Sequence, residues 1–126
     1  MKAYRIALFC VLSVFLGVIP SKASQDTHPD WETLADAIYQ AEDSQAHPYG
    51  IMVKYKTTTP RQACINTCKH KWLDWLEAGK PGSYMEYLAS KYAPIGASND
   101  PTGLNKNWLP NVRYYYAKFE AQYANA

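Results

Sequence analysis

The first segment of the chain most constrains what the remainder can fold into. Basic residues precede an apolar run from Ile6 to Ile19. A short segment with small residues, typical of a signal-peptide cleavage site, follows the run and ends at Ala23. This order is typical of a cleavable secretory signal. The run is shorter than the ~20 residues that a membrane-spanning helix needs, and no later segment approaches that length. We therefore expect a signal peptide over residues 1–23 and one folded domain over residues 24–126, with no stable membrane insertion after cleavage.

The net charge of the exported domain indicates which kinds of partner it could bind. Removal of residues 1–23 leaves ten basic residues against eleven acidic ones. A nearly neutral exported domain is a poor candidate for nucleic-acid binding, so we expect no nucleic-acid partner. The remaining charge is uneven, because one stretch is basic and has no acid within it: Lys54, Lys56, Arg61, Lys69 and Lys71. This stretch either faces an anionic polymer or is an ordinary solvated surface.

Hydrophobic spacing predicts four helices. Apolar positions recur three and four residues apart over residues 31–42, after possible N-caps at Thr27 and Asp30. Thr59-Pro60 begins the longest helix, whose stripe includes Trp72 and Trp75 as core residues and which stops at Gly79. Ser83 and Glu86 form a capping box for a third helix that closes at Ala93-Pro94. Asn105 or Asn107 caps a final helix through about Tyr123, with Pro110 in its first turn.

Only one segment favours an extended backbone. Residues 51–56 alternate between Ile, Val and Tyr on one side and Met and Lys on the other. Such alternation predicts a short strand or extended arm. The sequence therefore indicates a mostly α domain with a single short extended or β arm.

The segment at the end of the first predicted helix carries the most specific functional signal. It contains Glu42, then Asp43-Ser44, and further on Gly50-Ile51-Met52. This pattern resembles the lytic transglycosylases and goose-type lysozymes of the lysozyme-like superfamily, in which a helix ends in a catalytic Glu followed by Ser, and a Gly-Leu-Met-Gln stretch lines the cleft. The chain departs from that pattern at Asp43, which is interposed, and at Val53, which stands in place of Gln.

The resemblance implies a small lysozyme-like helical domain that cleaves the β-1,4 bond between MurNAc and GlcNAc in peptidoglycan. It implies Glu42 as the catalytic acid, with no cofactor and no metal. The glycan site would be lined by Ser44, Tyr49, Met52, Tyr92, Trp108, Asn111 and Tyr115. Together with the signal, it predicts a periplasmic or secreted monomer acting on peptidoglycan glycan strands in a bacterial cell envelope.

The chemistry needs a carboxylic acid that keeps its proton near neutral pH. Burial of Glu42 against Tyr39, Tyr49 or Met52 would raise its pKa in this way. Asp100 is the only candidate for a second carboxylate, so the lytic route, with one Glu acting as acid and then as base, is favoured over hydrolysis. Alternatively, Glu42 is a solvated acid at a helix end.

Two other classes of function stay open. One is a non-catalytic glycan-binding or envelope-assembly module of the same fold. The other is a secreted helical effector or inhibitor that has no affinity for wall glycan. Activity on purified cell wall separates the enzyme from the binding module, and binding to insoluble peptidoglycan tests the effector.

Two cysteines lie one helical turn apart in an oxidising compartment. Cys64 and Cys68 are compatible with a strained bridge, a pair of buried thiols or a bond to another chain. A metal site with His70 lacks a fourth ligand and a standard spacing. Nucleophilic chemistry with His70 or His47 is disfavoured, because both cysteines lie on an apolar face.

Overall fold

The computed structural model describes residues 27–126. The predicted signal peptide, residues 1–23, lies outside the described residues. The described chain is mostly helical. Four α-helices and two short 3-10 helices follow one another in the order α1 Trp31–Glu42, η1 Pro48–Gly50, α2 Pro60–Glu77, α3 Tyr84–Tyr92, η2 Leu104–Asn107 and α4 Trp108–Ala124. Within residues 27–126, no helix has the length and apolarity needed to cross a membrane.

Local sequence signals begin the first three helices where they were expected, whereas Asn107, at the start of α4, makes no side-chain cap bond. The Asp30 carboxylate accepts the Thr33 N–H at 2.8 Å, and the Thr59 hydroxyl accepts the Gln62 N–H at 3.1 Å. Ser83 forms a complete capping box at the start of α3. Each cap satisfies N–H groups that have no partner inside the helix.

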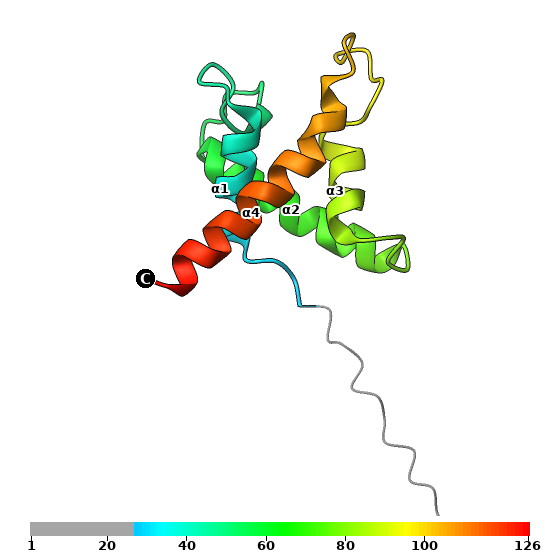
Figure 1. Cartoon of the computed structure of the whole chain (residues 1–126). Coiled ribbons are helices and arrows are strands. Elements are labelled where there is room, and N and C mark those ends of the chain that lie inside the picture. The colour runs from blue at the N-terminus through cyan, green and yellow to red at the C-terminus, as the bar shows by residue number, and fades with distance from the viewer. Residues whose placement is uncertain (1–26) are drawn as a thin grey trace, which may run out of the picture.

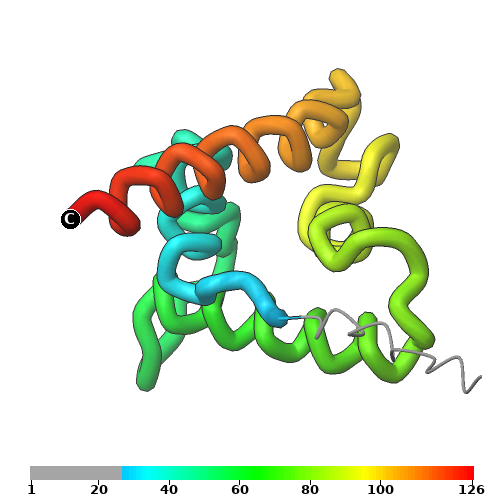
Figure 2. Tube along the Cα trace, turned by 60° about the horizontal axis from the view of Figure 1, so that its bottom comes forward, coloured from blue at the N-terminus to red at the C-terminus, as the bar shows by residue number. Residues whose placement is uncertain are grey.

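The helices surround a core drawn from all four of them. Figure 2 shows α4 and α2 on opposite sides, with α1 between them at one end and α3 at the other. The most extensive contact is between α1 and α4, which cross in Figure 1. The largest fully buried side chains come from every helix, and they are Leu34, Ile38, Cys64, Cys68, Leu88 and Val112. Because each helix buries one apolar stripe against the others, none is stable on its own.

The predicted strand is wrong. Residues 51–56 form neither strand nor helix, and residues 27–126 contain no strand at all. A strand needs a neighbouring strand to receive its backbone hydrogen bonds, and the helical domain offers none. Ile51 packs against the core cluster, while Met52 and Val53 are exposed. The segment is therefore an irregular surface loop.

Charged side chains join the helices at the surface. The Arg61 guanidinium lies 2.9 Å from both the Glu32 and Asp36 carboxylates, which ties α2 to α1. The Tyr123 hydroxyl donates to the other Asp36 oxygen at 2.9 Å and so ties α4 to the same point. Lys71 pairs with Asp74 at 2.7 Å. Two of the five cations in the basic stretch are thus already paired within the domain.

Both cysteines of α2 are free and buried. Side chains four residues apart on a helix have Cβ atoms roughly 5–6 Å apart, beyond the about 3.5–4.5 Å of a disulfide, so a bridge would require α2 to unwind locally. Hydrogen bonding to Cys64 and burial raise the pKa of the Cys68 thiol. The same hydrogen bond lowers the pKa of Cys64, but both sulfurs are buried, so the structure favours a pair of free thiols that reagents cannot reach.

The burial of both thiols can be tested on protein produced from residue 24 onward, in which Cys64 and Cys68 are the only cysteines because Cys10 is absent. We expect neither Cys64 nor Cys68 to react with Ellman's reagent under native conditions, because both thiols are inaccessible. Both should react once the protein is unfolded in guanidinium chloride. Failure of two thiols to appear on unfolding, without added reductant, would indicate a bridge instead.

Candidate active site around Glu42

Glu42 is the last residue of α1, and the helix stops there because of its neighbour. Asp43 adopts the left-handed conformation, with φ 43° and ψ 40°, and its N–H donates to the Tyr39 carbonyl. A residue in this conformation ends an α-helix. The chain then turns back through Ser44 into η1, where the Ser44 hydroxyl accepts the His47 N–H at 3.1 Å.

The Glu42 carboxyl is partly buried between α4 and η1. The Trp108 indole N–H donates to its Oε1 at 2.8 Å across 66 positions of sequence. On the other side lies the backbone of Gly50, where an added Cβ would stand 3.0 Å from Glu42 Cδ and Oε1. Gly50 has φ +68°, which suits glycine and lets its backbone approach this closely.

This environment changes the acidity of Glu42. Burial raises the pKa of the carboxyl above its usual value, because the charged form loses water. The indole N–H opposes that shift, since it stabilises the carboxylate, but burial is the larger effect. The result is a carboxyl group that holds its proton more tightly than an ordinary surface Glu.

Tyr92 connects the two groups that flank the Glu42 carboxyl, which are the Trp108 indole and the turn that contains Gly50. Its ring stacks on Trp108, with centroids 5.1 Å apart and planes inclined by 26°. Its hydroxyl donates to the Tyr49 carbonyl in η1 and lies 3.7 Å from the Cys64 sulfur. Burial raises the pKa of Tyr92, so the hydroxyl remains a donor. Tyr92 therefore braces both the indole and the turn that carries Gly50.

The loop before α4 fixes the position of Trp108. Asp100 is buried, and its carboxylate accepts the Gly96 N–H at 3.4 Å and the Asn105 N–H at 3.2 Å. The Asn105 amide in turn donates to the Pro94 carbonyl at 2.9 Å. These bonds hold the ends of the loop together, so α4 starts at a defined place.

Asp100, the candidate for a second carboxylate, and Asp43, the residue after Glu42, both have structural roles. Asp100 is occupied in stabilising its loop, whereas Asp43 is exposed and caps α1. Neither is bonded to Glu42 in residues 27–126. Glu42 thus stands as a single acid with an aromatic donor beside it.

The predicted site residues fall into two groups. Trp108 bonds to Glu42, Tyr92 stacks on Trp108 and bonds to the Tyr49 carbonyl, and Ser44 lies in the turn that follows Glu42. The Trp108 side chain points toward Glu42 and is only 6% exposed, and the Tyr92 hydroxyl points toward the Tyr49 carbonyl. Met52, Asn111 and Tyr115 make no hydrogen bond or ring contact with this group in the described chain, and Met52 is largely exposed.

The sequence named Tyr39, Tyr49 and Met52 as walls of the acid. The contacts that the structure shows for the Glu42 carboxyl are those with the Trp108 indole and the Gly50 backbone. Tyr39 packs instead on the Tyr49 ring at 5.1 Å. The resemblance placed Trp108 among the residues that line the glycan site, but nothing in the sequence indicated that its indole bonds to Glu42.

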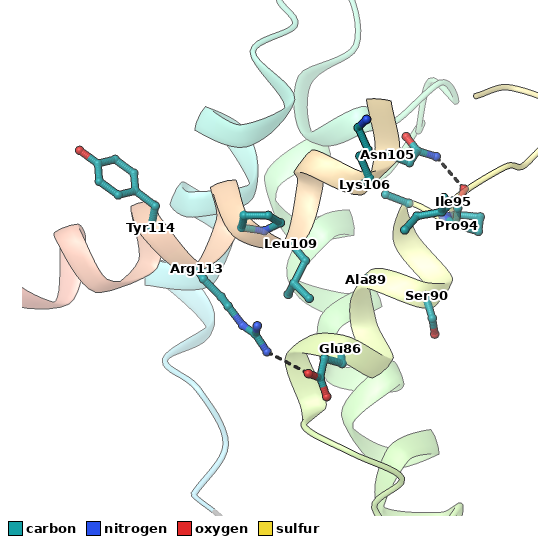
Figure 3. Close-up of a pocket in the computed structure, with 12 residues that line it drawn as sticks. Glu86, Ala89, Ser90, Pro94, Ile95, Asn105, Lys106, Leu109, Arg113 and Tyr114 are labelled. Carbon is teal, nitrogen blue, oxygen red and sulfur yellow. Dashed lines mark hydrogen bonds and ion pairs between the residues drawn. The ribbon is translucent and has the colours of Figure 1, made fainter. Parts of the chain in front are cut away.

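Three cavities of the described chain lie away from Glu42. One, about 1030 Å³, lies between α3 and α4 and is mostly apolar. Figure 3 shows Leu109 within it, with the Arg113–Glu86 pair at 3.5 Å at one end and the Asn105–Pro94 bond at the other. A second, about 580 Å³, is lined by aromatic residues that include Trp72 and Trp75. A third, about 370 Å³, lies under the loop of residues 51–58. Glu42 lines none of these three.

The described residues contain no group of three or more His, Cys, Asp and Glu side chains that would hold a metal ion. Comparison of the chain with protein-family models, with curated proteins and with solved structures finds no match. The surroundings of Glu42 are therefore the feature of this chain that bears most directly on function.

Proposed function

We propose that this protein cleaves the β-1,4 glycosidic bond between MurNAc and GlcNAc in peptidoglycan, with Glu42 as the acid, in a lysozyme-like domain of the periplasm or cell exterior. The observation that carries the proposal is the partly buried Glu42 carboxyl at a helix end, whose pKa burial raises and whose Oε1 accepts the Trp108 N–H. A general acid for glycoside cleavage needs such a raised pKa.

The residues support a route with one acid. In its first step, the Glu42 carboxyl gives its proton to the glycosidic oxygen as the bond to the anomeric carbon breaks. The resulting carboxylate then takes the proton of the 6-hydroxyl on the same MurNAc, while that oxygen bonds to the anomeric carbon. The product is a 1,6-anhydro end, and Glu42 is again protonated. No second carboxylate is required, which fits the engagement of Asp100 in its loop.

Trp108 has a defined role in this scheme. Its N–H stabilises the Glu42 carboxylate that forms after the first step and holds the carboxyl in one orientation. Tyr92 supports that indole from behind. We regard Trp108 and Tyr92 as positioning residues, with Ser44 and Tyr49 in the adjoining turn.

The product identifies the reaction. Purified peptidoglycan is incubated with the protein, and the released muropeptides are weighed by mass spectrometry, with Glu42→Gln as the matched control. The proposal predicts products with anhydro ends from the unmodified protein alone. Products one water heavier would indicate hydrolysis by the same acid. Equal release by both proteins would exclude Glu42 as the catalytic residue.

One observation favours a second candidate, a non-catalytic glycan-binding module of the same fold. Glu42 lines none of the three cavities described, and Trp108, which the resemblance places along the glycan, is only 6% exposed. This candidate predicts retention on insoluble peptidoglycan without release of fragments. A third, the helical effector or inhibitor, predicts neither retention nor release.

A substitution at Trp108 tests the electrostatics directly. Trp108→Phe keeps an aromatic ring against Tyr92 but removes the N–H donor. Because that donor lowers the pKa of Glu42, its loss should raise the pKa further. The carboxyl carbon of Glu42 is followed by ¹³C NMR through a pH titration, and the alkaline limb of the activity profile should move upward with it. An unchanged Glu42 titration would show that the indole has no such effect.

A further inference from the structure

The loop that follows η1 exposes apolar and basic side chains side by side. Met52 is 73% exposed, Val53 63% and Tyr55 48%, and Lys54 and Lys56 alternate with them. Isolated exposed apolar residues are common on protein surfaces, but three within four positions form a patch. Nothing in the fold of the domain requires them, because the core contact of this segment is made by Ile51.

The stretch of sequence that contains this patch has basic residues and no acidic ones. No acidic residue occurs from position 44 to position 73. Arg61 and Lys71 are neutralised by carboxylates of the domain, whereas Lys54 and Lys56 make no ion pair with any residue in 27–126. The loop thus presents two unpaired cations on a domain whose overall charge is nearly balanced.

The position of the loop leaves it accessible. Figure 1 shows this segment projecting beyond the C-terminal end of α1, at the periphery of the helices. It has no regular backbone pairing, and a cavity of about 370 Å³ lies beside it. A peripheral loop of this kind contacts a large, flat partner without strain in the core.

We propose that residues 52–56 bind the surface of an anionic lipid bilayer. Met52, Val53 and Tyr55 enter the boundary between headgroups and acyl chains, while Lys54 and Lys56 lie against the lipid phosphates. A hydrated polyanion would satisfy the lysines but gains nothing from Met or Val, whereas a bilayer satisfies both kinds of side chain. The contact is peripheral and needs no spanning helix.

The proposal does not depend on glycan cleavage, and its test needs no activity. The domain is sedimented with vesicles of phosphatidylglycerol and phosphatidylcholine, and separately with phosphatidylcholine alone. We expect binding only to the anionic vesicles and weaker binding as salt rises. Lys54→Gln with Lys56→Gln should lower the partition coefficient about tenfold or more, since each lysine contributes near the surface. Met52→Ser with Val53→Ser should lower it several-fold.

Controls separate binding from folding. Lys118→Gln removes one exposed charge from α4, far from the loop in sequence, and should leave binding unchanged. All variants should keep the thermal midpoint of the unmodified protein, because the substituted side chains are exposed. Absence of binding to anionic vesicles at low salt overturns the proposal. It is also overturned if Met52→Ser with Val53→Ser binds as well as the unmodified protein, and soluble polyphosphate competing fully in that case would indicate a polyanion site instead.

Discussion

Replacement of Glu42 by Gln should reduce glycan cleavage about 10²- to 10⁴-fold, which is the usual contribution of general acid catalysis. Gln is nearly isosteric, and its amide oxygen still accepts the Trp108 N–H, so the site should keep its shape. The loss would then reflect the missing proton and not a changed fold. Release of muropeptides from purified peptidoglycan, followed over time, measures it.

The same substitution should make the protein more stable at neutral pH. Because burial raises the folded pKa of Glu42, the folded state binds the proton more tightly than the unfolded chain does. Stability from this group is therefore full below the unfolded pKa and is lost as pH rises through the folded value. Gln carries no charge at any pH, so Glu42→Gln should melt at a higher temperature at pH 7, and the difference should vanish below about pH 4.

Glu77 supplies a matched control, since it is the last residue of α2 as Glu42 is of α1. Glu77→Gln changes the charge at a helix C-terminus equally but at an exposed position. We expect it to leave cleavage intact and to lack the pH-dependent gain of Glu42→Gln. A gain of equal size in both variants would mean that the helix dipole, and not burial, is responsible.

Gly50→Ala should give the second large effect. The added methyl would stand 3.0 Å from Cδ and Oε1 of Glu42, closer than carbon and oxygen atoms normally approach. In addition, φ +68° costs an L-residue about 1–2 kcal/mol. The carboxyl must move, and a displacement of about 1 Å at a catalytic group reduces rates on the order of 10²-fold. Denaturant unfolding and cleavage assays measure the two losses.

Gly79 allows the two causes to be separated. It has φ +81°, and nothing lies within 4 Å of a Cβ added there. Gly79→Ala therefore carries the backbone cost without any contact to Glu42, and it should leave cleavage unchanged. In a Glu42→Ala background, Gly50→Ala should cost no more stability than Gly79→Ala. If the extra cost persists in that background, Gly50 is constrained by something other than the acid.

Sequence reasoning succeeded where structure is determined locally. The caps at Asp30, Thr59 and Ser83 are read from residues within one turn of each helix start, and all three are present. The strand over residues 51–56 was wrong because alternation alone does not supply a partner strand. The position of Glu42 at the end of α1 was also readable, since it follows directly from the helix.

The surroundings of Glu42 could not be read in the same way. Trp108 is 66 positions away, and its side chain reaches the carboxyl only after the loop around Asp100 has placed α4. The approach of Gly50 depends on a left-handed backbone conformation that the sequence permits but does not specify. Distant packing and loop geometry therefore decide the acidity, while the pattern of residues indicates only which acid to consider.

The bond from Trp108 to Glu42 also determines when the acid acquires its properties during folding. A chain that has not yet docked α4 lacks the indole and the stacked Tyr92, so its Glu42 is an ordinary hydrated carboxyl. Incomplete chains, and products of proteolysis that lose α4, are therefore expected to be inert toward glycan. Docking of the final helix would thus complete the surroundings of the proposed acid.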